Sequence, residues 1–390
     1  KAFDLKDSGG SFTDCAGFDS FIPNDPGLMM VPSAAHENLK WIDPRPVPGG
    51  EATTNVDTPP ADGFFDKTDF KGAFGTDLWL ADWSILADYK LLPDNIMPDE
   101  ILKGDVTADK TLDASKTYFM TEQVFVKNGA TLTIEAGTTI KSYRTGVSGA
   151  APALVIEQGA KIMAAGTASK PITFTSALPA SQLPVSGAWG GVIVLGKATI
   201  AGGPTDSIEG LPTGDGIYGG SDDADNSGTM QYVRIWYGGS VIGKDNEING
   251  LTLGGVGSGT TLDHIEIAHN LDDGIEFFGG AARVKYLSVL FCGDDGIDSD
   301  QGWRGKIQYA VVVVGKAGHH ALEMDSKTGG DLDSSPRSRP QLYNALLIGG
   351  SGDPASVSSD DQVKGIARLR EGTAGEFGNI VLANIPGKAV

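Results

Sequence analysis

The stretch Leu262-Asp-His-Ile-Glu-Ile-Ala-His-Asn-Leu-Asp-Asp-Gly-Ile-Glu276 matches Val284-Lys-Tyr-Leu-Ser-Val-Leu-Phe-Cys-Gly-Asp-Asp-Gly-Ile-Asp298 at an offset of 22 residues. A third copy runs from Ile307-Gln-Tyr to Glu323-Met-Asp325, and a fourth begins at Gln341-Leu-Tyr. In each copy apolar and polar residues alternate, as they do in a strand with one buried face. Repetition at one fixed offset is the sequence signature of a solenoid, in which each repeat packs on its neighbours.

A coil of about 22 residues has room for several short strands and none for a helix. The sequence therefore predicts an all-β, right-handed parallel β-helix, in which equivalent residues stack at a strand spacing of about 4.8 Å. The 55 glycines and 20 prolines suit many tight turns. A β-sandwich would not require residue-for-residue matching, and the Leu/Asn ladder of a leucine-rich repeat is absent.

An earlier repeat sets the expected domain boundaries. Residues 129–140 match residues 151–162 at the same offset, which predicts that Leu132 stacks on Leu154 and Gly137 on Gly159. We expect the β-helix to span residues 105–390, with inserted loops around 176–249. Residues 1–104 are rich in proline and aromatic residues, and we interpret them as an irregular cap or linker, because the end of a β-helix exposes strand edges that need cover.

The net charge of -20 makes nucleic acid and anionic membranes poor partners and favours cations. No run approaches the roughly 20 apolar residues that cross a bilayer, so we expect no membrane insertion. Cys15 and Cys292 are too few for a disulfide framework, and whether they pair is left open.

Three stretches resemble secreted bacterial β-helix proteins of the pectate-lyase-like type, many of which are lipoproteins or secretion cargo without an assigned activity. They are residues 129–140, residues 245–261, and the pair Asp272-Asp-Gly-Ile-Glu276 and Asp294-Asp-Gly-Ile-Asp298. The resemblance implies the same fold and an extracellular or cell-surface location. In that family a motif like residues 64–83 follows the last coil, whereas here it precedes the first. We therefore expect either one unit of a tandem or head-to-tail fibre, whose partners are copies of itself or neighbouring units, or a single-unit protein with an N-terminal cap.

Aligning the repeats gathers acidic residues into columns. Like charges at strand spacing repel, so they need a cation, a basic neighbour or a raised pKa. Carboxylates and turn carbonyls are the ligands that Ca²⁺ prefers, so the sequence predicts bound calcium. The alternative is that each Asp caps its own turn. The columns are Asp272, Asp294 and His319; Asp273, Asp295 and His320; Glu276, Asp298 and Glu323; and Asp300 with Asp325; a second candidate site is the loop with Asp222, Asp223 and Asp225.

Catalysis is the competing hypothesis. Four short motifs follow the order seen in polygalacturonase-type glycoside hydrolases, to which they are similar: Asn270-Leu-Asp-Asp, Gly293-Asp-Asp-Gly, Gly318-His-His and Arg368-Leu-Arg370. The resemblance implies that two of Asp273, Asp294 and Asp295 would serve as acid and base on a polysaccharide. His319 or His320 would tune their protonation, and Arg368 or Arg370 would hold a uronate carboxylate. A lyase would instead use Lys306 or Arg304 as base.

The motifs depart from that family, since Thr is missing from the first and His320 replaces a glycine. Two further residues have structural interpretations. His264 aligns with Tyr286 and Tyr309, which predicts a stacked side chain, and Gly274 is expected, like Gly296, at a turn that needs positive φ. The sequence thus predicts an extracellular, calcium-stabilised structural or adhesive β-helix, with a polysaccharide-active enzyme as the alternative.

Overall fold

The computed structural model describes residues 27–30, 42–94, 96–142, 151–212, 214–243, 246–327, 333–349 and 366–385. Contacts divide the chain into two units, Lys1–Asn95 and Ile96–Val390. In the first, β1 (Leu28–Met30) pairs antiparallel with β2 (Asp43–Pro46), followed by a 3-10 turn (Glu51–Thr53) and the short helix α1 (Ile85–Asp88). A small core of Phe74, Leu78 and Leu92 holds this unit together.

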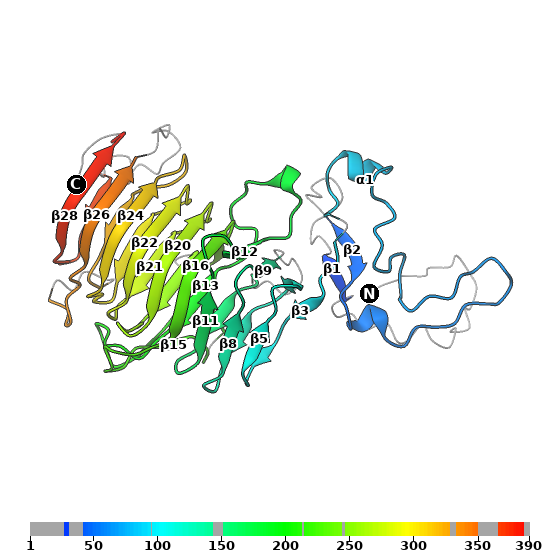
Figure 1. Cartoon of the computed structure of the whole chain (residues 1–390), viewed down its shortest axis with the longest axis horizontal. Coiled ribbons are helices and arrows are strands. Elements are labelled where there is room, and N and C mark those ends of the chain that lie inside the picture. Colours follow the sequence, from blue (N-terminus) through cyan, green and yellow to red (C-terminus); the bar gives the residue numbers. More distant parts are fainter. Residues whose placement is uncertain are drawn as a thin grey trace, which may run out of the picture. The chain divides into compact units, whose positions relative to one another are not determined.

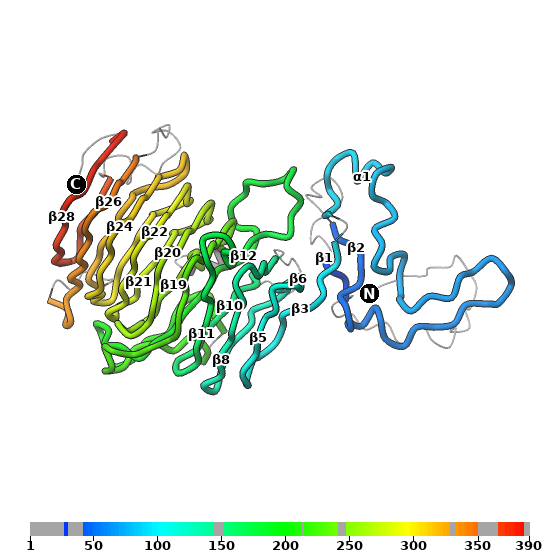
Figure 2. Tube along the Cα trace, viewed as in Figure 1, coloured from blue at the N-terminus to red at the C-terminus, as the bar shows by residue number. Residues whose placement is uncertain are grey.

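The second unit is a parallel β-helix, as the repeats predicted. Figure 1 shows its strands stacked side by side from β3 to β28, and Figure 2 follows the same coils as a continuous trace. One sheet has nine strands: β4 (Asp105–Val106), β7 (Val124–Val126), β10 (Leu154–Ile156), β13 (Val192–Leu195), β19 (Leu251–Gly254), β21 (Ile275–Phe278), β23 (Ile297–Asp300), β25 (Leu322–Met324) and β27 (Ala367–Leu369).

The other sheet has thirteen strands, which also pair in parallel. Ten form its main path: β3 (Glu100–Leu102), β6 (Thr117–Met120), β9 (Thr139–Ser142), β12 (Ile172–Ser176), β16 (Gly228–Trp236), β20 (Thr261–Ala268), β22 (Arg283–Leu290), β24 (Lys306–Val313), β26 (Gln341–Ile348) and β28 (Glu376–Ala383). Three pair beside it: β5 (Lys110–Leu112), β8 (Thr131–Ile134) and β11 (Lys161–Ala165).

Two antiparallel hairpins and a 3-10 turn (Ala180–Gln182) interrupt the coils between residues 176 and 249. The hairpins are β14 (Asp206–Ser207) with β15 (Ile217–Tyr218), and β17 (Ser240–Gly243) with β18 (Asn246–Ile248). Among the described residues no helix is long and apolar enough to cross a membrane.

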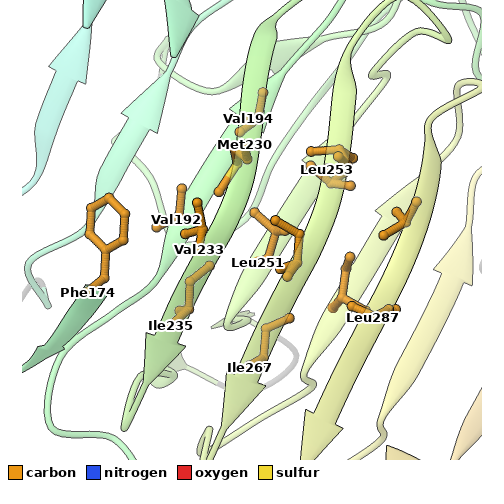
Figure 3. Packing of buried hydrophobic residues seen from close by; sticks show 14 of the residues in the cluster. Phe174, Val192, Val194, Met230, Val233, Ile235, Leu251, Leu253, Ile267 and Leu287 are labelled. Carbon is orange, nitrogen blue, oxygen red and sulfur yellow. The ribbon is translucent and has the colours of Figure 1, made fainter. Parts of the chain in front are cut away.

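The core lies between the two sheets and explains the alternation in sequence. Figure 3 shows Val192 and Leu251 of the nine-stranded sheet in one cluster with Val233, Ile235 and Ile267 of the other. All five side chains are at most 1% exposed. Burying one such side chain contributes roughly 1.5–3 kcal/mol, so this continuous cluster is the main source of stability.

The register of the early coils differs from the expectation. Leu132 pairs with Ile162, and Leu154 pairs with Val124. The predicted stacking of Leu132 on Leu154 is therefore wrong, because a coil contains more than one strand–glycine–strand corner and the comparison matched different corners. The equivalent corners are those of Gly129 and Gly159, whose φ angles of 75° and 86° favour glycine. The later offset is confirmed, since Leu262 pairs with Val284.

Candidate metal centre

The strands β21, β23 and β25 bring acidic residues of three consecutive coils together. Glu276 pairs with Asp298, and Asp298 pairs with Glu323. The column continues to Arg368 on β27. Because neighbouring strands lie about 4.8 Å apart, the side chains of such a column are direct neighbours. The structure thus brings these three carboxylates together in the register expected from the repeats.

A second column lies in the turns before these strands and is tied to the backbone. The amide nitrogen of Asp295 donates to Oδ1 of Asp273 at 2.8 Å. In the next coil, the amide nitrogen of His320 donates to Oδ1 of Asp295 at 2.6 Å, and the His320 ring nitrogen Nδ1 lies 2.8 Å from the same oxygen. Asp273, Asp295 and His320 are only 7%, 1% and 1% exposed, so this column is shielded from solvent.

The outer column contains Asp272, Asp294 and His319, which are half-buried. Nδ1 of His319 contacts Oδ1 of Asp294. Oxygen atoms of Asp272, Asp273 and Asp294 lie within 4.8 Å of one another, as do ligand atoms of Asp294, Asp295 and His319. These two columns and the column of Glu276, Asp298 and Glu323 form one contiguous acidic region. We call these three columns the acidic columns.

Two arginines balance the charge at one end of this region. Nη1 of Arg368 lies 2.7 Å from Oε1 of Glu323, and Nη2 of Arg370 lies 3.2 Å from the same atom. Nε of Arg370 also donates to Oδ2 of Asp325 at 2.6 Å. Asp300, which lies one coil before Asp325, accepts a hydrogen bond from the amide of Gln301 at 2.6 Å. Positive charge thus reaches β25 directly from β27.

The other end of the acidic columns is surrounded by negative charge. Burial raises the pKa of Asp273, Glu276 and Asp298 well above the usual range, and the strongest charge interactions on each come from other carboxylates, which raise it further. Burial, followed by Asp294, raises the pKa of Asp272 to about 8. These groups therefore keep their protons to a higher pH than exposed carboxyls do, and a bound cation would favour their ionised forms.

The pKa values of Asp295 and Glu323 are shifted in opposite directions. Burial raises the pKa of Asp295, and its hydrogen bond to Glu323 raises it further. Burial acts to raise the pKa of Glu323 as well, but the hydrogen bond from Asp295 and the charges of Arg370 and Arg368 outweigh it and lower the value. Asp295 therefore keeps its proton to a higher pH than Glu323 does.

The end of the acidic columns that Asp273, Glu276 and Asp298 form has the dimensions of a cation site. Carboxylate oxygens of Asp273, Glu276 and Asp298 lie within 4.8 Å of one another. Two oxygens that ligate one Ca²⁺ at about 2.3–2.6 Å are at most about 5.2 Å apart. The three carboxylates therefore fit around a single ion with little rearrangement.

Asn249 is a further candidate ligand that the sequence reasoning missed. Its Nδ2 donates a hydrogen bond to Oε2 of Glu276, and the side chain is 1% exposed. Its Oδ1 is buried and makes no hydrogen bond to any residue that the structure describes. A half turn of the amide places this oxygen beside Glu276. The sequence carried a signal for this residue, since Asn249-Gly-Leu resembles Asp273-Gly-Ile. The pairing of Leu251 with Ile275 places the two tripeptides in register.

A family model described as pectate-lyase-like β-helix domain matches residues 104–389. The chain belongs to this family. Comparisons with curated proteins and with solved structures returned no match. Membership of the pectate-lyase-like β-helix family covers the whole described solenoid from β4 onward, and with it every residue of the acidic columns.

The second predicted calcium site of this pectate-lyase-like β-helix has a different environment. Asp223 receives both Nη1 and Nη2 of Arg304 at 3.1 Å. Oδ1 of Asp222 accepts the amide of Ala224, and Oδ2 of Asp225 accepts the hydroxyl of Ser227. These carboxylates are occupied by an arginine and by local turn contacts, so the structure does not bring them together as a ligand cluster with one another.

The candidate catalytic carboxylates differ in exposure, since the side chain of Asp294 is 38% exposed. Asp273 and Asp295 are buried, and Arg368 is engaged by Glu323. His319 faces Asp294 in the outer column. Of the two candidate lyase bases, Arg304 pairs with Asp223 of the 222–225 loop, and Lys306 lies on β24 of the other sheet beside Arg283. Two of the three candidate carboxylates, Asp273 and Asp295, therefore lie beneath the surface, whereas Asp294 is partly exposed.

Gly274 and Gly296 directly precede β21 and β23. The reason that glycine occupies these positions differs from the prediction. Neither is among the glycines with positive φ, so the expected left-handed turn is wrong. A Cβ atom on Gly274 would overlap Cγ1 of Val289, and one on Gly296 would overlap Cγ1 of Val312. Glycine is needed because the opposite sheet approaches closely at these positions.

Proposed function

We propose that this β-helix binds Ca²⁺ through Asp273, Glu276 and Asp298 and serves as an extracellular structural or adhesive module. One observation carries the proposal: the buried carboxylates of Asp273 and Glu276 and the half-buried carboxylate of Asp298 come from two adjacent coils and lie within 4.8 Å of one another. Asn249 donates its Nδ2 to Glu276, and its buried Oδ1 has no hydrogen-bond partner among the described residues. A divalent cation would neutralise these charges and supply the partner that the amide oxygen lacks. Oxygen-only ligands favour Ca²⁺ over softer metals.

A structural role is supported by burial. An ion held by Glu276 on β21 and Asp298 on β23 would add a bond between two adjacent coils. Such bonds matter in a solenoid, because each coil contacts only the coils beside it. The acidic chain, with a net charge of -20, suits a cation-rich extracellular medium. Copies of the same chain or neighbouring repeat units are the partners we expect for such a module.

Calcium titration tests the proposal. Wild-type protein stripped with EDTA is titrated with CaCl₂ by calorimetry, alongside Asp273→Asn, Glu276→Gln and Asp298→Asn variants. Each amide variant should bind calcium at least about tenfold more weakly, because it loses a charged ligand. The matched control is Asp263→Asn, which changes a carboxylate on β20 in the other sheet and should leave calcium affinity unchanged.

Folding of the variants is checked in EDTA by circular dichroism. An amide in place of a buried carboxyl removes the cost of ionisation, so the variants should fold at least as well as wild type at pH 8. The proposal fails if wild-type protein shows no heat of calcium binding and no rise in melting temperature up to millimolar CaCl₂. Sedimentation with and without calcium then measures self-association.

A polysaccharide-active enzyme is the second candidate, favoured by the opposite pKa shifts of Asp295 and Glu323. Environments that separate two carboxyl pKa values are typical of acid–base pairs in hydrolases. Release of reducing ends from polygalacturonate, abolished in Asp295→Asn, would establish this function. Its absence, together with calcium binding, favours the structural module.

A further inference from the structure

The thirteen-stranded sheet carries a column of rings in left-handed backbone conformation. Tyr232, His264, Tyr286 and Tyr309 occupy equivalent positions in four consecutive coils, with φ angles of 49°, 52°, 56° and 64°. Their ring centroids are separated by 4.2, 4.3 and 5.0 Å along the column. The prediction that His264 is a stacked side chain is confirmed.

These rings stand where asparagine would cost less. The next two coils have Asn344 and Asn379 at the equivalent position, with φ angles of 58° and 56°. Asparagine tolerates left-handed backbone, whereas a bulky ring is strained there. Stacking offsets part of this cost at roughly 0.5–1.5 kcal/mol per pair. Tyr286 and Tyr309 are 45% and 43% exposed, so core packing does not require them.

A cavity of about 230 Å³ lies beside this column. Tyr232, His264 and Tyr286 line it, and Ala168 and Pro171 line it from the turn after β11. Its polar groups come from three adjacent strands. They are Arg234 on β16, Glu266 on β20 and Ser288 on β22, which pair with one another across the sheet.

The polar groups of the cavity are held in place. Nε1 of Trp236 donates to Oε1 of Glu266 at 3.0 Å, and the guanidinium of Arg234 lies 5.1 Å from the centre of the Trp236 ring. A donor, an acceptor and a hydroxyl thus stand in one row at strand spacing, beside the edges of stacked rings. This arrangement matches a ring with several hydroxyl groups and an apolar face.

Charge and size narrow the ligand class. Arg234 and Glu266 carry opposite charges side by side, so the cavity favours a ligand without net charge. The net charge of -20 on the chain also disfavours an anionic ligand. The volume is below the roughly 300–1,000 Å³ of pockets for drug-sized molecules, which favours a single ring. We propose that this cavity binds one pyranose unit of a neutral glycan.

This proposal goes beyond the cation site and does not depend on it, because the two sites use different sheets. The test is calorimetric titration of the full chain with cellohexaose, mannohexaose and xylohexaose, in EDTA and again in CaCl₂. At least one of these neutral hexasaccharides should bind in both buffers. Hexagalacturonate is the anionic comparison and should bind more weakly than the neutral ligand.

The key variant is Tyr286→Asn, which removes a ring. It introduces asparagine, the residue type that occupies the equivalent position in two later coils as Asn344 and Asn379. It should fold normally and bind the hexasaccharide about tenfold or more weakly, through lost ring contacts. Glu266→Gln should also weaken binding. The matched control is Phe291→Asn: Phe291 has φ 60°, is 42% exposed and lies 5.1 Å from His269, yet it does not line the cavity. Its affinity should stay within about twofold of wild type.

Three results would overturn the proposal. One is the absence of binding by all three neutral hexasaccharides. Another is equal loss of affinity in Tyr286→Asn and Phe291→Asn. The third is tighter binding of hexagalacturonate than of any neutral ligand. Calcium binding by the acidic columns is measured separately, so failure here leaves that result intact.

Discussion

The Asp273 side chain accepts the backbone N–H of Asp295, one coil further along, at 2.8 Å. Asp295 repeats the contact with the N–H of His320 at 2.6 Å. In these two coils a carboxyl group is thereby bonded to the backbone of the next coil. Either protonated or ionised carboxyl oxygens can accept such a bond, so it persists when the charge state changes. The charge itself, however, is costly at these buried positions.

Stability without calcium should fall as pH rises. Five carboxyl groups of the acidic columns and the nearby Asp325 have a raised pKa, with Asp272 at about 8 and Asp325 at about 7. A carboxyl with a raised pKa favours the folded state while protonated, and this stabilisation is lost between its unfolded pKa near 4 and its folded value. Urea unfolding in EDTA should therefore give a lower free energy at pH 8 than at pH 5. Millimolar CaCl₂ should remove most of this difference, and a free energy that rises from pH 5 to pH 8 in EDTA would contradict the assignment.

Arg370→Gln should raise the pKa of Asp325 above its value of about 7. Burial raises this pKa, and the Arg370 charge opposes the rise. Carbon-detected NMR of the carboxyl resonances measures the titration directly. The free energy of unfolding should drop by about 1–3 kcal/mol at pH 8, where Asp325 would lose its partner, and by less at pH 5. Arg337→Gln is the control, because Arg337 pairs with exposed Asp333.

Gly274→Ala should destabilise the solenoid by roughly 1–3 kcal/mol, as overpacking does. The new Cβ atom would overlap Val289 Cγ1 and lie 2.6 Å from the carbonyl oxygen of Gly296. Gly203→Ala is the matched control, because its nearest atom would be 3.6 Å away. Urea denaturation of both variants compares them; equal stability would show that the coil wall yields.

Leu287→Ala should cost about 2–5 kcal/mol, because it leaves a cavity between the sheets. Leu287 is 1% exposed, whereas Leu346 on β26 is 36% exposed and points outward. Leu346→Ala removes the same atoms and should cost less than about 1 kcal/mol. Thermal unfolding of the pair measures the difference, and comparable losses would contradict the observed facing of the strands.

The fold and the later register could be predicted because residues 262–325 repeat with little insertion. Stacking then turns equal spacing into contact, so the pairing of Glu276 with Asp298 follows from sequence alone. The early coils misled the alignment because similar corners recur within one coil. Leu132 therefore matched Leu154 in letters, although Ile162 is its neighbour in space.

Contacts that cross an insertion could not be predicted. Arg304 reaches Asp223 from 81 residues away, through loops whose path no periodicity encodes. Asn249 was missed because the acidic columns were followed only from Asp272 onward, although its alignment with Asp273 marks the same position. The close approach behind Gly274 depends on the distance between two sheets, which a one-dimensional repeat does not specify.

The bonds from Asp273 and Asp295 to the following coil also restrict slippage of the strands. A shift by one residue would turn every core side chain outward, so hydrophobic burial forbids it. A shift by two residues keeps inward positions inward, and burial alone would barely oppose it. Such a shift would break both side-chain bonds to the backbone and leave the buried N–H groups of Asp295 and His320 without acceptors. The polar side chains of Asp273 and Asp295 thus fix the register of the strands. The apolar core alone would barely distinguish this register from one shifted by two residues.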